Sequence, residues 1–171
     1  MGEATQPEAW QRGPLPGITP LLQPAAHAIL QAAEEVQQMM QGFPAALLFS
    51  KAAGMASPGF HLRHMAGVLD RLFTYAAGNA LSETQLQYLK EEVAATAIVS
   101  PQQLVDSFCR QANLCLEQLK QIPEADILLP RGIGRKQIPT NVIGLIFHAA
   151  EHVQRHTGQL LVTIAILKAG S

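Results

Sequence analysis

The segment from Thr140 to about Lys168 constrains the fold most, because its apolar side chains recur at three- and four-residue steps. At 100° per residue they form one stripe along a helix, together with Leu145. The stripe contains Val142, Ala149, Val153, Leu160 and Leu167. We therefore predict a long helix that begins after Thr140 as N-cap and buries one face, which other elements must cover.

Four more helices are predicted, from Leu21 to Met40, from Pro58 to about Ala77, from about Glu83 to Ala95 and from about Pro101 to Gln121. Ser57 and Ser100 each precede a proline, the arrangement typical of an N-cap and first helical residue. Ser82 stands three residues before Gln85, the spacing of a capping box. Because no segment alternates long enough for a sheet, we expect an all-α four-helix bundle with one extra short helix.

The segments between these helices contain most of the glycine and proline residues. Residues 1–16 are expected to form a flexible N-terminal arm, and residues 17–171 a single bundle domain. Residues 124–139 contain two prolines and two glycines, so we expect a long irregular loop before the last helix. Within it, Ile127–Leu129 could at most form a short extended piece.

The composition excludes several functional classes. The chain has 12 Lys+Arg against 13 Asp+Glu, which argues against a nucleic-acid partner held by phosphate neutralisation. No apolar run reaches the ~18 residues of a membrane span. The start lacks a signal pattern, and Cys109 and Cys115 cannot form a local disulfide, so a cytoplasmic location is expected. With 48% hydrophobic and 15% charged residues, we expect a homodimer.

Two histidines of the last predicted helix fall on its apolar face. His156 lies about 20° to one side of Leu145, and His152 lies about 20° to the other side. A buried imidazole without a partner costs about 1–3 kcal/mol, so two together need an explanation. One explanation is a divalent metal bound by both rings, which the i, i+4 spacing points at one place. The other explanation is that both are core histidines bonded to backbone or water.

A third imidazole for such a site is available on the second predicted helix. His61 lies about 50° from the centre of its apolar face, and His64 lies about 110° from it. Periodicity alone leaves both residues open. Either choice places three imidazoles on two helices and leaves a position for water or substrate. For such nitrogen ligands, zinc or nickel is the expected metal.

Two stretches resemble one known family. Gly59–Leu72 is similar to the second helix of the DinB/YfiT-like superfamily, and His148–Gln159 resembles its C-terminal His-x-x-x-His-x-Gly-Gln signature. The resemblance covers roughly Leu21 to Leu167. It implies a four-helix bundle with a three-histidine metal site, formed by His64, His152 and His156, with His61 as the reserve third ligand.

The resemblance also suggests functions, because some superfamily members are thiol-S-transferases or isomerases and others are metal-dependent hydrolases. We therefore expect a divalent metal that activates water or a low-molecular-weight thiol, for hydrolysis or thiol transfer on a small-molecule substrate. The alternative is a metal-binding or stress-response interaction module without turnover, since no general base is evident beside the ligands. No catalytic residue is assigned.

Charged and polar residues near these motifs have weaker assignments. Arg135 and Lys136, in a basic glycine-containing loop, could bind the anionic part of a thiol cofactor near the metal. Arg71, Tyr75 and Gln159 fall near the histidine faces by helical angle and could orient a ligand, although such residues are more often at the surface. Arg71 also stands next to Asp70, which suggests surface charge. The pairs Glu34–Glu35 and Glu91–Glu92 are expected to face solvent.

Overall fold

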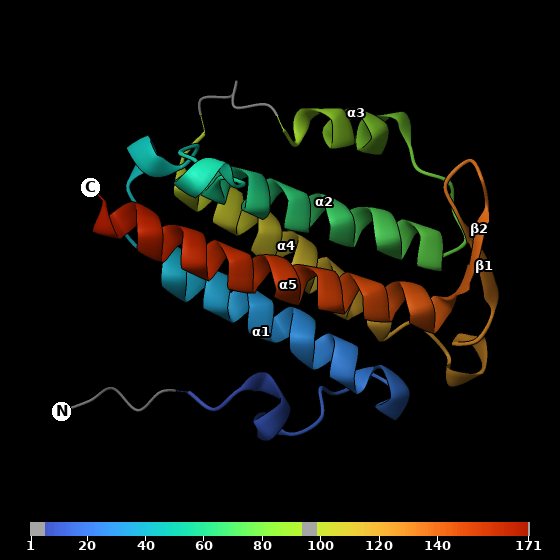
Figure 1. Ribbon diagram of the computed structural model, residues 1–171. Coiled ribbons are helices and arrows are strands. Elements are labelled where there is room, and N and C mark those ends of the chain that lie inside the picture. Colours follow the sequence, from blue (N-terminus) through green and yellow to red (C-terminus); the bar gives the residue numbers. More distant parts are fainter. Residues whose placement is uncertain (1–5, 94–98, 171) are drawn as a thin grey trace.

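The computed structural model describes residues 6–93 and 99–170. Its main helices are α1 (Gln23–Met40), α2 (Pro58–Ala76), α3 (Glu83–Glu91), α4 (Pro101–Leu119) and α5 (Val142–Ala169). A hairpin of β1 (Pro130–Ile133) and β2 (Ile138–Asn141) precedes α5. Short 3₁₀ turns lie at Ala9–Arg12, Pro20–Leu22, Ala45–Leu47, Ala52–Gly54 and Glu124–Asp126. The predicted helical bundle with one extra short helix is confirmed (Figure 1).

The four long helices enclose one apolar core. Both α1 and α2 pack against α4 and α5. In Figure 1, α1 and α5 run in one direction and α2 and α4 in the other, while α3 lies outside the bundle beside α2. The core includes the fully buried side chains of Ile29, Leu62, Met65, Leu69, Phe108, Leu119, Leu145, Ile146 and Leu160. This packing places the histidine-bearing faces of α2 and α5 together.

Serine side chains begin three of the helices, as their sequences predict. Their hydroxyl oxygens accept backbone N–H groups one turn into each helix, which satisfies donors that the helix leaves free. The pairs are Phe60 N with Ser57 Oγ (3.3 Å), Gln85 N with Ser82 Oγ (3.2 Å) and Gln103 N with Ser100 Oγ (3.2 Å). The predicted cap of the last helix is wrong by one residue: Asn141 Oδ1 accepts from Gly144 N at 2.8 Å, and Thr140 lies in β2.

The segment predicted as an irregular loop before the last helix instead contains an antiparallel hairpin. Pro130 pairs with Asn141, and Ile133 pairs with Ile138. In a sheet of two strands, each strand has one edge that pairs with no other strand. Proline, which has no N–H group to donate, is tolerated in both strands at such an edge. Gly134 adopts a φ of 63° at the start of the turn. Strands of four residues are too short to show an alternating pattern in the sequence.

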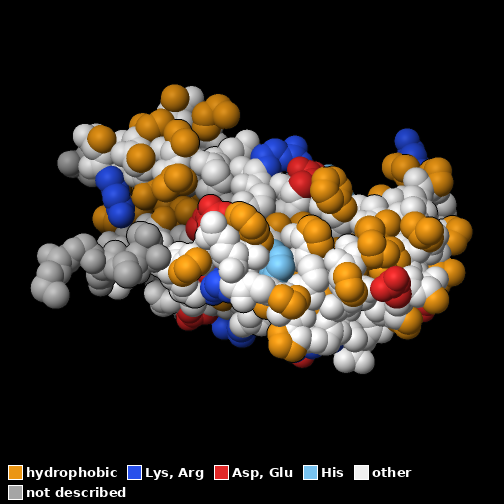
Figure 2. Space-filling view, turned by 90° about the horizontal axis from the view of Figure 1, so that it is seen from below, with side chains coloured by type: hydrophobic (Ala, Val, Ile, Leu, Met, Phe, Trp, Pro, Cys, Tyr) orange, Lys and Arg blue, Asp and Glu red, His pale blue; other side chains and the backbone are white. Residues whose placement is uncertain are grey.

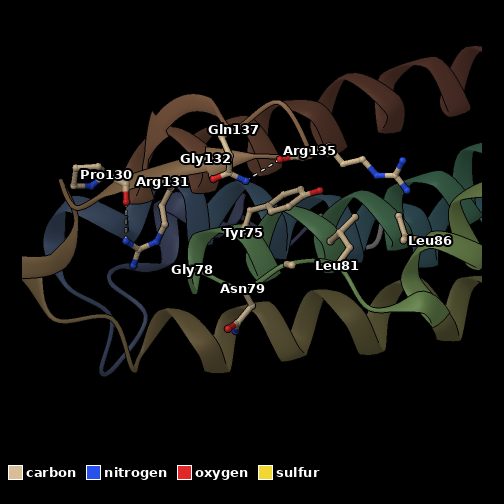
Figure 3. A pocket seen from close by; sticks show the side chains of 12 residues that line it. Tyr75, Gly78, Asn79, Leu81, Leu86, Pro130, Arg131, Gly132, Arg135 and Gln137 are labelled. Atoms are coloured by element: carbon tan, nitrogen blue, oxygen red, sulfur yellow. Dashed lines mark hydrogen bonds between the residues drawn. The ribbon is translucent and has the colours of Figure 1, made fainter.

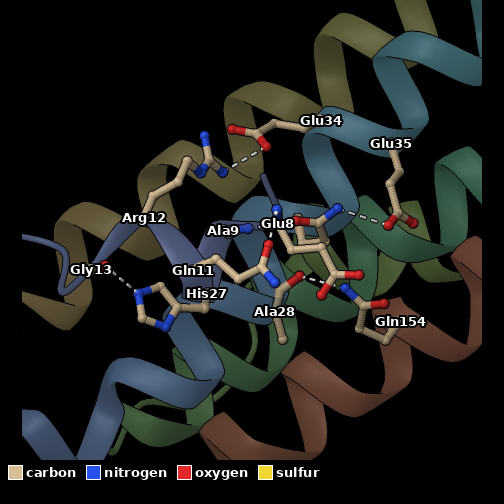
Figure 4. Close-up of polar contacts among 11 residues, drawn as sticks. Glu8, Ala9, Gln11, Arg12, Gly13, His27, Ala28, Glu34, Glu35 and Gln154 are labelled. Carbon is tan, nitrogen blue, oxygen red and sulfur yellow. Dashed lines mark hydrogen bonds and ion pairs between the residues drawn. The ribbon is translucent and has the colours of Figure 1, made fainter. Parts of the chain in front are cut away.

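The N-terminal segment contacts α1 where the structure describes it (Figure 4). The backbone N–H of Ala9, a buried residue, donates to Gln31 Oε1 at 2.8 Å. Arg12 Nη2 donates to Glu34 Oε2 at 2.7 Å, and this ion pair joins the segment to the middle of α1. The division of the chain into an arm and a bundle domain at residue 16 stays a prediction.

The surface carries few charges. In Figure 2, charged side chains are scattered among hydrophobic and neutral ones. Within residues 6–93 and 99–170, no helix has the length and hydropathy needed to cross a membrane.

Candidate metal centre

Helices α2 and α5 bring three of the predicted ligands together. One ring nitrogen from each of His64, His152 and His156 lies within 4.8 Å of the others. His64 Nε2 lies 3.0 Å from His152 Nε2. Two nitrogens bound to one tetrahedral zinc ion lie about 3.3–3.4 Å apart, so small ring movements suffice to accommodate an ion. The arrangement could therefore hold a metal ion.

His61, the reserve ligand, contacts a member of this group. Its Nδ1 lies 3.0 Å from Nδ1 of His156. One of these two nitrogens must carry the proton and the other must accept it, so the contact fixes the relative orientation of the rings. Among the described residues, no group close enough to hold a metal contains His61, whereas His64 belongs to the group with His152 and His156. The geometry thus favours His64 at the position that periodicity left open.

A buried carboxylate supports His64 from outside the bundle. Glu92, directly after α3, has its Oε2 2.8 Å from His64 Nδ1. Its other oxygen accepts from Arg71 Nη1. Glu92 is only 4% exposed and Arg71 only 8%. The prediction that Glu92 faces solvent is therefore wrong, and so is the assignment of Arg71 to surface charge, because the two form a buried pair that holds the His64 ring.

Gly67 makes room for this buried pair. A Cβ at this position would collide with Glu92 Oε1 and would lie 2.6 Å from Arg71 Nη1 and 2.8 Å from Tyr88 Cε1. Glycine inside a helix costs about 1 kcal/mol relative to alanine, so its presence in the middle of α2 has a packing reason. The sequence signal for the site is thus a glycine three residues after His64.

Burial keeps several of these imidazoles neutral. It lowers the pKa of His61 to about 4, and the nearby His64 ring adds to the effect. Burial is also the main cause that lowers the pKa of His152 to about 4 and that of His156 to about 3, again with His64 contributing. At neutral pH these rings therefore have free lone pairs, which a metal ligand requires.

Further contacts flank the histidine group. The Phe60 ring stacks on His64, with centroids 5.1 Å apart. Arg155 Nη2 lies 3.0 Å from His152 Nδ1 and 3.0 Å from Glu151 Oε1. A second possible metal group, formed by His148, Glu151 and His152, lies on the more exposed side of α5. Because it shares His152 with the first group, the two groups compete for the same residue.

A cavity opens beside the histidines. It has a volume of about 490 Å³ and lies between α5 and the segment before α2. His61, Arg155, Gln159 and Thr163 contribute its polar groups. Its apolar lining comes from Ala52, Ala53, Met55, Ala56, Val162 and Ile166. A small molecule in this cavity would contact residues next to the metal group.

Two other predicted residues lie far from the histidines. Arg135 and Lys136 are in the turn of the hairpin. The hairpin lies at the end of α2, where Arg131 Nε donates to the carbonyl oxygen of Ala76 at 2.7 Å. Ala76 follows His64 by twelve residues, about 18 Å along a helix. The structure therefore does not bring this basic loop to the metal group.

Neither cysteine supplies a nucleophile near the histidines. Both lie in α4, and burial raises the pKa of Cys109 to about 11 and that of Cys115 still further. The neutral thiol is a poor nucleophile at pH 7.

Comparisons with known proteins agree with this architecture. A family model of the DinB superfamily matches residues 3–160. A conserved protein from Enterococcus faecalis has a similar structure, with a TM-score of 0.71 and 18% identity over 86% of this chain and 96% of that chain. A search of curated proteins gave no match.

Two other solved structures are similar. The Sibling Lethal Factor Precursor DfsB has a TM-score of 0.61 and 15% identity over 81% of this chain and 92% of that one. A protein from Streptococcus pneumoniae has a TM-score of 0.61 and 14% identity, covering 85% of this chain and 88% of its own. At these identities, the likeness shows the fold alone.

Proposed function

Because the chain belongs to the DinB superfamily, we propose that it is a metal-dependent enzyme in which His64, His152 and His156 hold one divalent ion, zinc or nickel. The reaction is hydrolysis, or thiol transfer from a low-molecular-weight thiol, on a small substrate. The observation that carries the proposal is the convergence of three imidazole nitrogens within 4.8 Å between two helices.

The donor set fits a catalytic metal. The low pKa values of His152 and His156 leave both rings neutral, as ligands must be. Three protein ligands leave one position of a tetrahedral ion open. When bound, such an ion acts as a Lewis acid and lowers the pKa of a water or thiol at that position.

The surrounding residues hold the ligands in place. Glu92 Oε2 accepts a hydrogen bond from His64 Nδ1–H, and this tautomer leaves the lone pair on Nε2, which faces His152. Arg71 Nη1 donates to the second oxygen of Glu92 and so fixes the orientation of the carboxylate. His61 restrains the ring of His156 in the same way.

The cavity of about 490 Å³ beside His61 is the proposed substrate site. Its mostly apolar walls favour a small molecule with an apolar body. Arg155, which lines the cavity and contacts His152, provides a cation for a carboxylate on the substrate or thiol. This position makes Arg155, rather than Arg135 or Lys136, the cation expected to bind an anionic group near the metal.

Elemental analysis tests the metal assignment. The purified protein is loaded with zinc or nickel, desalted and analysed; one ion per chain is expected. His156→Ala should lose the ion. His148→Ala is the matched control and should keep it, because His148 belongs only to the exposed second group. An unchanged metal content in His156→Ala, or loss in His148→Ala alone, would overturn the assignment.

Activity assays then test the reaction. The metal-loaded protein is assayed with a panel of small esters and with conjugation of low-molecular-weight thiols, beside the chelated protein. Turnover that depends on the metal supports an enzyme. Stoichiometric metal with no turnover on either panel would favour the alternative, a metal-binding module without catalysis.

We also propose that the chain forms a homodimer. Helix α5 leaves the apolar side chains of Phe147, Leu161, Val162 and Ile166 more than half exposed, at 66%, 54%, 58% and 52%. Exposed apolar groups on one helix favour association. Light scattering at micromolar concentration should give about twice the monomer mass of 18.4 kDa, and a monomer would refute the proposal.

A further inference from the structure

A larger cavity lies at the opposite end of α2, away from the histidines. It has a volume of about 600 Å³ and is formed by the end of α2, the following turn, α3 and the hairpin (Figure 3). That volume is within the range of about 300–1,000 Å³ typical of small-molecule sites. The residues that matter for its chemistry are Tyr75, Leu81, Leu86, Pro130, Arg131 and Arg135.

The lining is positively charged. Arg131 and Arg135 both contribute to it, and among its described residues there is no acidic side chain. Arg131 is fixed by two backbone carbonyls, with Nε 2.7 Å from Ala76 O and Nη1 2.9 Å from Pro130 O. Arg135 makes no hydrogen bond or ion pair with any residue in 6–93 or 99–170. One guanidinium is thus preorganised, and the other is available to a ligand.

The two cations are separated by an apolar stretch. In Figure 3, Arg131 and Arg135 lie on either side of Tyr75, whose hydroxyl group points toward the Arg135 side. Leu81 and Leu86 line the cavity between α2 and α3. A ligand that contacts both arginines must therefore be elongated, with anionic groups at its ends and an apolar middle.

We propose that this cavity binds an elongated organic dianion, such as an aromatic dicarboxylate, at a site independent of the metal group. Guanidinium groups pair with carboxylates through charge-assisted hydrogen bonds, which are stronger than neutral ones. The Tyr75 ring and the two leucines contact the body of the ligand, and the Tyr75 hydroxyl donates to the carboxylate at Arg135. Lys136, the neighbour of Arg135, does not line the cavity and takes no part.

Nuclear magnetic resonance titration of the full chain tests the proposal, with terephthalate as the probe. The expected result is a set of chemical-shift changes at the backbone amides of Gly78, Gly132 and Gly134, which line the cavity. Benzoate, with one carboxylate, should bind about tenfold more weakly, because one charged hydrogen-bonded pair is missing. The neutral terephthalamide should give no shifts. Shifts centred on the histidines, or equal shifts with terephthalamide, would overturn the proposal.

Matched variants separate a site from general positive charge. Arg135→Gln should weaken terephthalate binding about tenfold, whereas Lys136→Gln, which removes the same charge one residue away, should leave it unchanged. Equal losses in both variants would show attraction by net charge only and would refute the site. Metal-free and metal-loaded protein should bind the probe equally, so this result does not depend on the proposed enzyme function.

Discussion

The two ends of α2 carry opposite chemistry. Near its start, His64 joins two imidazoles of α5, and the low pKa values of these partners make them lone-pair donors suited to a cation. Near its end, Arg131 and Arg135 line a cavity with groups that can only donate hydrogen bonds. One helix thus contributes to a proposed cation site through His64 and to a proposed anion site through Tyr75, about 17 Å apart along its axis.

The two ends of α2 also differ in the contacts that fix their functional side chains. At the histidine end, the support is the buried carboxylate of Glu92, which directly follows α3 and bonds to His64 and Arg71 of α2. At the hairpin end, Arg131 is held by backbone carbonyls, two bonds that are partly exposed. Substitutions at the histidine end should therefore cost more stability than substitutions at the hairpin end.

The largest effect is expected for Glu92→Ala. It leaves Arg71 as a buried, unpaired cation, which should lower the free energy of unfolding by about 3–5 kcal/mol. Loss of the bond to His64 should weaken metal binding about 10–100-fold. Denaturant unfolding and metal titration measure the two effects. The control is Glu91→Ala, an exposed neighbour, which should change stability by less than about 0.5 kcal/mol. Equal effects in both variants would contradict the role of Glu92.

Gly67→Ala should have the next largest effect. Its methyl group displaces Glu92 and Arg71, and overpacking of this kind costs about 1–3 kcal/mol. Weaker metal binding should accompany the loss. Gly158→Ala is the control on α5, because its Cβ would meet nothing within 4 Å. Thermal unfolding should show this variant stabilised by about 0.5–1 kcal/mol, from helix propensity. A stable Gly67→Ala variant would mean that the buried pair can move freely.

The metal-free protein should lose stability as the pH falls. The pKa values of His61 and His152 are lowered to about 4 and that of His156 to about 3, whereas the unfolded chain has the usual value near 6.5. The unfolded state therefore binds more protons between about pH 6.5 and pH 3. The stabilising effect is full above pH 6.5 and is lost as the pH falls through this window.

Thermal unfolding with a chelator present measures this effect. We expect the Tm to be about 3 °C lower at pH 4.5 than at pH 7.5, a modest value because solvent screens these partly exposed rings. His61→Gln removes one titrating group and should reduce the difference. An identical pH dependence in this variant would contradict the role of His61.

The smallest effect is expected for Arg131→Gln. It removes charge-assisted bonds to backbone carbonyls at the end of α2, and because these are partly exposed the cost should be about 0.5–1.5 kcal/mol. The metal affinity should stay unchanged. If this variant weakened metal binding as Glu92→Ala does, the two ends of α2 would not be independent.

Much of the fold could be predicted from local patterns. Three serine caps and the apolar stripes predict where the helices lie, because capping and hydrophobic periodicity depend on residues that are only about one helical turn apart. The same angles placed His152 and His156 on the face that packs against α2. The predicted cap of α5 is wrong by one residue, because Thr140 and Asn141 are both good capping residues and it is Asn141, directly before Val142, whose Oδ1 accepts from Gly144 N.

Glu92 and the hairpin could not be predicted in this way. Glu92 follows a short polar helix and stands next to the exposed Glu91, so its local pattern is that of a solvated residue. Its burial depends on Gly67, which lies twenty-five positions earlier. The strands of the hairpin are short and contain prolines, so the β-propensity of their residues is low. They are stabilised mainly by pairing with each other, which a local pattern does not show.

The attachment of α3 has a consequence for how metal affinity is set. No residue of α3 is buried, and it is joined to α2 by polar bonds, from Gln85 Nε2 to Asp70 and Thr74 and from Tyr88 OH to the carbonyl of Arg63. A helix held in this way opens at lower free energy than the core helices. Each such opening would withdraw Glu92 from His64, so the proposed metal site would bind its ion more tightly the larger the fraction of time that α3 is docked.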